Sequence, residues 1–144
     1  MDVASFLSAL IVALITTFGA IWYNHYLEKE TIKKGFISEL LINAEIMKRS
    51  YEQFRVNKIG KSYPILHTVV YEDIRRKGIL YELPEELRTQ IVNLYNNIIA
   101  FNTASNASIY GLVPIDPEKA TSALSLMLSL VNNILQRLKQ LWKM

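Results

Sequence analysis

Residues 3–23 read VASFLSALIVALITTFGAIWY, a run of 21 residues without a charged side chain. An α-helix rises about 1.5 Å per residue, so a helix of this length spans the roughly 30 Å hydrocarbon layer of a bilayer. Trp22, Tyr23 and Tyr26 gather at its C-terminal end, as aromatic residues do at a membrane interface. The run therefore predicts a transmembrane anchor over residues 1–26.

A cleaved signal peptide is the alternative interpretation of the same run. Only Met1 and Asp2 precede it, so the basic N-terminal region of a signal peptide is missing. Phe18-Gly19-Ala20 does not form the small-x-small pattern of a cleavage site. We therefore expect an uncleaved span.

The flanking charges predict the orientation of this span. No Lys or Arg precedes it, whereas Lys29, Lys33 and Lys34 follow it. Basic residues stay on the cytoplasmic side of a membrane. We expect a single-pass protein of the cell membrane with its N-terminus outside and residues 27–144 in the cytoplasm.

Side-chain size divides the span into two faces when its residues are placed about 100° apart around a helix. Large aliphatic and aromatic side chains occupy one face. The other face carries small or hydroxyl-bearing residues. Small residues permit close helix–helix packing, and hydroxyl groups in hydrocarbon seek hydrogen-bond partners. These residues are Ser5, Ser8, Ala9, Val12, Ala13, Thr16, Gly19 and Ala20.

Three roles for this face stay open. It could join copies of the chain, pack against the span of another protein, or have no role beyond that of an anchor. In a ring of copies, Ser5, Ser8 and Thr16 would line a narrow aqueous path. The face carries no charge, which argues against an ion filter built from charged side-chain rings.

The first helix is expected to continue past the membrane to about residue 57. Apolar residues recur there every three or four positions and form one seam. The seam predicts packing within the protein's own bundle; an intermolecular coiled coil is the alternative. Its residues are Ile37, Leu40, Ala44, Met47, Tyr51 and Phe54.

Three further helices follow from start and stop signals. Pro64 predicts a start and Gly78 a left-handed end of a helix over residues 64–77, after a loop over 55–63. Pro84 predicts the start of the next helix, and a polar loop is expected over 103–115.

Asp116-Pro117-Glu118 predicts the start of the last helix. Residues 120–136 of this helix carry no charge, so a second membrane span is an alternative, but Asn132 and Asn133 would be costly in lipid. We expect a bundle helix with the seam Leu124, Met127, Val131, Ile134 and Leu138. The predicted fold class is all-α, with one transmembrane helix continuing into a cytoplasmic bundle of about four helices.

No residue pattern predicts an enzyme. There is no cysteine, and the two histidines, His25 and His67, lie far apart without a metal-ligand pattern. No nucleophile and base can be paired. The net charge of +3 is too small to indicate nucleic-acid binding. We therefore expect no catalytic residues, no metal, no cofactor and no nucleic-acid partner.

The order of parts resembles the small single-span helical proteins that accompany prokaryotic antiviral systems of the CRISPR and Argonaute types. The resemblance covers the span, the helix ELLINAEIMKRS and the stretch YEDIRRKGILYELPEELRTQIVNLYNNIIAFN. It implies a role in altering membrane integrity during infection. An Arg followed four to six residues later by His, the ribonuclease pattern of some helical effectors, is absent.

These observations predict a membrane-anchored, self-associating helical protein without enzymatic activity, in one version a pore-type effector in prokaryotic defence. Membrane lipids and other copies of the chain are the expected partners. The alternative is an accessory subunit or adaptor of a larger membrane complex, with the cytoplasmic bundle binding another protein.

Overall fold

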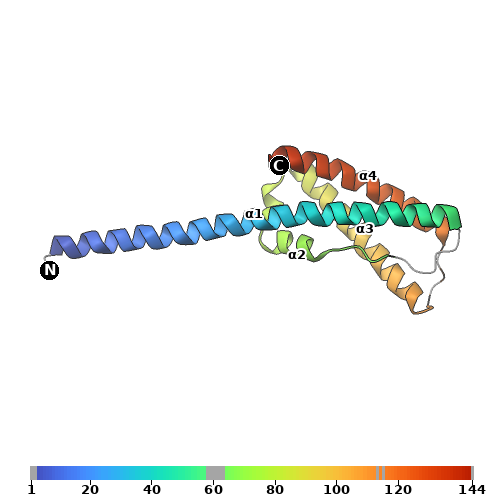
Figure 1. Cartoon of the computed structure of the whole chain (residues 1–144), viewed down its shortest axis with the longest axis horizontal. Helices are drawn as coiled ribbons and strands as arrows, with labels where there is room; N and C mark the ends of the chain where they lie inside the picture. Colours follow the sequence, from blue (N-terminus) through green and yellow to red (C-terminus); the bar gives the residue numbers. More distant parts are fainter. Residues whose placement is uncertain (1–2, 58–63, 113, 115, 144) are drawn as a thin grey trace. The chain divides into compact units, whose positions relative to one another are not determined.

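A computed structural model describes residues 3–57, 64–112, 114 and 116–143 of the chain. The described residues form helices and loops without a strand, which confirms the all-α fold and the long apolar N-terminal helix followed by a helical bundle (Figure 1). The chain divides into two compact units, residues 1–34 and 35–144. The predicted boundary at residue 26 marks where the helix would leave the membrane, which differs from this division by contacts, and it stays a prediction.

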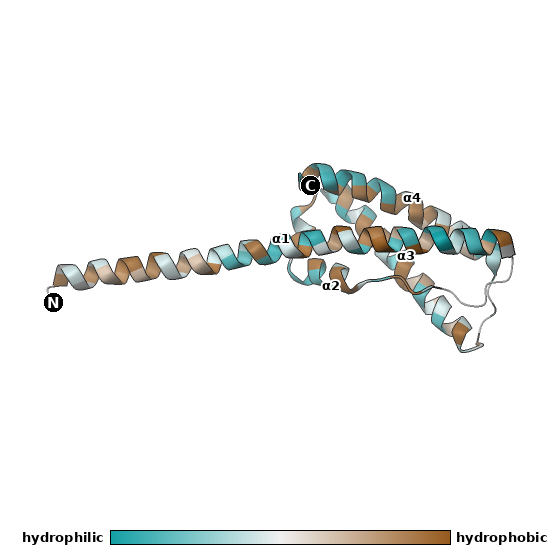
Figure 2. Ribbon diagram, viewed as in Figure 1, coloured by the Kyte–Doolittle hydropathy of each residue, from teal (hydrophilic) through white to brown (hydrophobic). Residues whose placement is uncertain are grey.

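The first unit is the N-terminal part of helix α1, which runs over Val3–Asn57. Residues 3–23 of this part carry no charged side chain, and brown and white predominate along them in Figure 2. A helix that is apolar all round is a buried helix or a membrane span. No proline interrupts the described helix, so one element carries both the apolar run and the start of the bundle.

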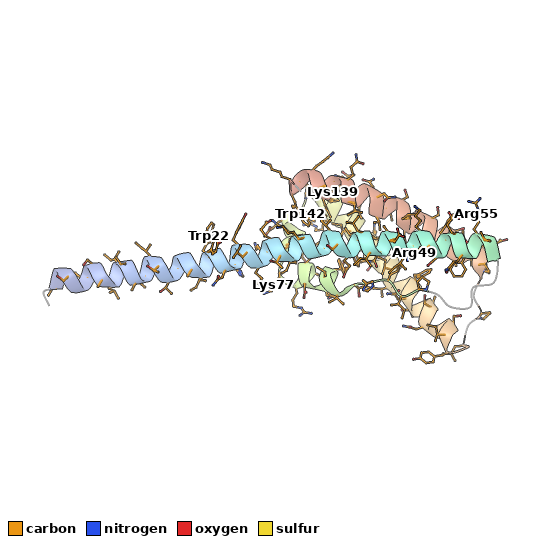
Figure 3. All side chains as sticks on the ribbon, in the orientation of Figure 1. Trp22, Arg49, Arg55, Lys77, Lys139 and Trp142 are labelled. Atoms are coloured by element: carbon orange, nitrogen blue, oxygen red, sulfur yellow. The ribbon has the colours of Figure 1, made fainter. Side chains whose placement is uncertain are left out.

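The second unit is built from the C-terminal part of α1, α3 (Glu85–Ile109) and α4 (Pro117–Leu141), with the short helix α2 (Val69–Arg76) and a 3-10 turn, η1 (Ile79–Glu82). Phe36, near the start of this unit on α1, is fully buried, with ring centroids 5.8 Å from Tyr95 of α3 and 6.4 Å from Trp142 after α4. Figure 3 shows Trp142 at the end of α4.

The two predicted seams lie in or beside the core of this unit. From α1, Ile37, Leu40, Met47 and Phe54 are buried, while Ala44 and Tyr51 are half-buried. From α4, all five seam residues are buried: Leu124, Met127, Val131, Ile134 and Leu138. The apolar residues of α3 at Leu87, Ile91, Leu94, Ile98 and Phe101 are buried in the same core.

Two capping signals have the predicted geometry. The Asp116 carboxylate accepts hydrogen bonds from the N–H groups of Glu118 and Lys119 at the start of α4. The bond from the Lys119 N–H lowers the pKa of Asp116. Gly78 has φ +74°, the left-handed conformation expected after α2.

Four predicted boundaries were wrong or displaced. Residues 64–68 are not helical, and α2 begins at Val69. The loop expected from residue 103 begins after Ile109, because α3 continues through the Ser/Ala/Asn stretch. Pro84 precedes α3 as its N-cap rather than filling its first turn. The loop expected over 55–63 is helical through Asn57, and residues 58–63 lie outside the described part of the chain.

Candidate functional site

Within the described residues, one helix is long and apolar enough to span a membrane: α1, over Leu7–Val56. Its apolar window is not buried against any other part of the described chain. Ile15 is 68% exposed and Trp22 is 72% exposed. An exposed apolar surface of this extent marks a binding or membrane surface.

All eight residues of the predicted small-residue face lie on this exposed part of α1. Their hydroxyls do not lack partners, however. Ser8 Oγ donates to the Ser5 carbonyl at 2.9 Å, and Thr16 Oγ1 donates to the Val12 carbonyl at 2.8 Å. Such bonds to the preceding turn satisfy the donors within one helix. The case for helix association therefore depends on close packing and not on unmet hydroxyl donors.

Gly19 lies near the C-terminal end of this face. Apart from the neighbouring backbone of α1, no described atom lies within 4 Å of a Cβ added there, so no contact within the described residues requires a glycine. Glycine in a helix interior costs roughly 0.5–1 kcal/mol relative to alanine. A close approach by another helix is a physical reason for accepting that cost.

The interfacial aromatics lie at the end of the apolar part. Trp22 and Tyr26 are stacked with their ring centroids 6.2 Å apart, and both side chains are exposed, as is Tyr23. Figure 3 shows Trp22 projecting from the helix. Amphipathic rings in this position suit the boundary between hydrocarbon and headgroups.

A second cluster, which the sequence patterns did not reveal, lies inside the bundle around Glu39. The Glu39 side chain is buried, and its carboxylate accepts three hydrogen bonds. The donors are the N–H groups of Val70 and Tyr71, at 2.7 and 3.2 Å, and the Tyr95 hydroxyl at 2.7 Å. The N-cap residue of α2, Thr68, forms no side-chain cap. Glu39 of α1 takes over that role, because its carboxylate accepts the bonds from the first turn of α2.

Two asparagines hold the extended segment that leads into α2. Asn43 bonds both the N–H and the carbonyl of His67, at 2.7 and 2.8 Å. Asn102 bonds both backbone groups of Leu66, each at 2.8 Å. These four bonds replace the intrahelical bonds that the predicted helix over residues 64–68 would have made.

Burial and the neighbouring carboxylate raise the pKa of Tyr95. Burial also raises the pKa of Tyr71, whose ring stacks on Tyr95 with centroids 3.9 Å apart, and the charge of Arg75 opposes that shift. The cluster is closed: no described buried side-chain polar atom lacks a hydrogen-bond partner. Its hydrogen bonds support the fold by joining α1, α2 and α3.

The bundle offers no metal centre among the residues that the structure describes, since no three ligating side chains lie together there. His25 Nδ1 lies 3.4 Å from Glu28 Oε2 in the first unit, and His67 lies in the segment before α2.

No protein-family model matches the chain, and no match was found among the curated proteins or the solved structures.

Proposed function

We propose that this protein is a non-enzymatic membrane protein, anchored by the N-terminal part of α1 and assembled from several copies through the small-residue face of that helix. The observation that supports this proposal is the unburied apolar window of α1. Each Leu, Ile, Phe or Val at the centre of a span favours insertion by about 0.3–0.6 kcal/mol. The ten such residues between Val3 and Tyr23 therefore favour the membrane by several kcal/mol.

The proposed orientation places the bundle in the cytoplasm. Lys29, Lys33 and Lys34 follow the span closely, and basic residues stay on the cytoplasmic side of a membrane. Lys33 forms an ion pair with Glu30 at 3.0 Å, but acidic residues have little weight in this rule.

Self-association is supported by the distribution of small residues. A helix with Gly19 and Ala20 beside Thr16, and with Ala9 beside Ala13, allows another backbone to approach closely. A ring of copies is the form of this proposal that would permeabilise a membrane, the activity that the resemblance to prokaryotic antiviral proteins implies. The oxygens of Ser5, Ser8 and Thr16 would then accept hydrogen bonds from water in the path.

An adaptor role is the second candidate, and one surface favours it. The end of α3 and the turn that follows it expose three large apolar side chains, Ile109, Tyr110 and Leu112. Such a cluster suits a partner protein. In this role the span would pack against the span of another protein, and the purified chain would be monomeric.

Paired substitutions on the two faces of the span separate these candidates. Ala9→Leu with Ala13→Leu places large side chains where copies would meet, so the assembly in mild detergent should contain fewer copies than that of the parent. Ile11→Leu with Ile15→Leu keeps the volume of the opposite face and serves as the matched control. An assembly size that is equal in both variants and the parent would contradict association through this face.

If the parent forms a ring, it should also release dye from liposomes. The control pair should leak like the parent, and the Ala9→Leu, Ala13→Leu pair should not leak. A parent that is monomeric in detergent and causes no leakage supports the adaptor role instead. The isolated bundle, from Ile32 onward, would then bind its partner without the span.

A further inference from the structure

The outward face of α4 has a composition unlike that of a solvated helix. The exposed residues between positions 120 and 136 carry amides, hydroxyls or an aliphatic side chain, and none is charged. A helix face in water usually carries charged residues as well as polar ones. We call this surface the neutral face of α4; it comprises Ser122, Ser125, Leu126, Ser129, Asn132, Asn133 and Gln136.

Grooves lie on both sides of the neutral face. On the α1 side, a groove of about 480 Å³ is bordered by Tyr51, Ser125 and Ser129. A second groove of about 600 Å³ lies beside Phe54, and Thr121 and Ser122 of α4 line both grooves. On the α3 side, a groove of about 300 Å³ is lined largely by alanines and apolar residues. A helical ridge between two grooves is the shape that helix–helix packing requires.

Leu126 is the apolar centre of this ridge. Its side chain is 59% exposed, and it borders the grooves on both sides of α4. In an interface between two copies, the Leu126 side chain of one copy would enter a groove of the other copy. The same surface thus offers both a projecting side chain and grooves.

We propose that the neutral face of α4 docks on the same face of a second copy of this chain. In a two-fold interface each residue meets the same surface on its partner, so a charged face would place like charges together. The absence of charge from residues 120–136 removes that repulsion. Copies held in one membrane by the proposed anchor also have a raised effective concentration, and only this part of the argument rests on the proposed function.

The absence of cysteine from the chain allows a direct test. Ser129→Cys places one thiol on the neutral face, and Lys48→Cys places one on an exposed position of α1 as the control. Full-length variants in nanodiscs are treated with a short bismaleimide and resolved on a denaturing gel. We expect Ser129→Cys to cross-link into dimers on the order of tenfold more efficiently than Lys48→Cys, because docking fixes the two thiols near each other.

A second variant and a mass measurement complete the test. Leu126→Lys, combined with Ser129→Cys, should abolish the cross-link while the helical content stays at that of the parent, because Leu126 is exposed. Equal cross-linking at both cysteine positions would overturn the inference. If native mass spectrometry shows several copies per disc without a Ser129→Cys cross-link, docking through α4 is wrong and association through the span stands. Single copies would overturn both.

Discussion

The Tyr95 hydroxyl donates a hydrogen bond of 2.7 Å to the buried carboxylate of Glu39, joining α3 to α1. The same carboxylate caps α2, so one acidic side chain connects three helices of the bundle. A buried charge is tolerated only when hydrogen bonds satisfy it. The Glu39 cluster therefore explains why a short helix of eight residues without a side-chain cap of its own has a defined position.

Replacing the charge at Glu39 should destabilise the bundle. In Glu39→Gln the amide has one acceptor oxygen for three donors, and its NH2 group faces N–H groups. We expect a loss of about 2–3 kcal/mol in the free energy of unfolding. Denaturant unfolding of the full chain in detergent measures it. Glu45→Gln, in an exposed pair with Arg49, is the control and should change stability by about 0.5 kcal/mol or less. Equal effects of the two substitutions would contradict the capping role.

The raised pKa values of Tyr95 and Tyr71 predict weaker folding in alkali. Folded tyrosines with a raised pKa keep their protons where unfolded tyrosines lose them. Their contribution to stability is therefore present below about pH 10 and is lost as the pH rises above it. The free energy of unfolding, measured from pH 8 to pH 11, should fall less steeply in Tyr95→Phe than in the parent. Parallel curves would argue against a buried, protonated Tyr95.

The asparagine bonds predict a local effect that differs from global unfolding. Asn43→Ala with Asn102→Ala removes four side-chain bonds to the segment before α2. Opening of this segment should become easier by about 1–2 kcal/mol for each asparagine. Hydrogen exchange should accelerate at the amides of Leu66 and His67 before it accelerates in α3. Uniform acceleration across the bundle would mean that the asparagines support the whole core instead.

Start and stop residues predicted α4 and the left-handed Gly78 because these signals act within one turn. Periodicity likewise predicted the buried seams of α1 and α4. The start of α2 was missed because the bonds that hold residues 64–68 come from Asn43 and Asn102, which lie 24 and 36 residues away in sequence from their partners. The Glu39 cluster was also missed, because the partners of Glu39 on α2 and α3 lie far away in sequence. A single Glu among apolar residues forms no local pattern that would predict them.

The extent of α3 was also misjudged from local composition. The residues TASNASI read as a loop because Ser, Asn and Thr favour turns. In the bundle they continue α3 to Ile109, and Ser105 is buried with its hydroxyl bonded to the Phe101 carbonyl at 2.8 Å. Packing against the neighbouring elements overrides weak propensity at such positions.

The depth of Trp22 in a bilayer can be measured because the chain has two tryptophans. Trp142→Phe removes the other one and keeps an aromatic ring against Phe36, 6.4 Å away in the parent. In liposomes, lipids brominated near the headgroups should quench Trp22 emission more than lipids brominated near the bilayer centre. The reverse order would place the span at a different register, and no quenching by either lipid would mean that this helix does not enter the membrane.

The number of chains per nanodisc tests the central claim most directly. The full-length protein is reconstituted at low protein-to-lipid ratio, and native mass spectrometry reports how many copies each disc holds. An anchored protein that associates through its span should give discrete assemblies of two or more chains, and about six or more would make the face of Ser5, Ser8 and Thr16 the candidate lining of a path. Single chains in every disc, or a protein that remains outside the discs, would contradict the account.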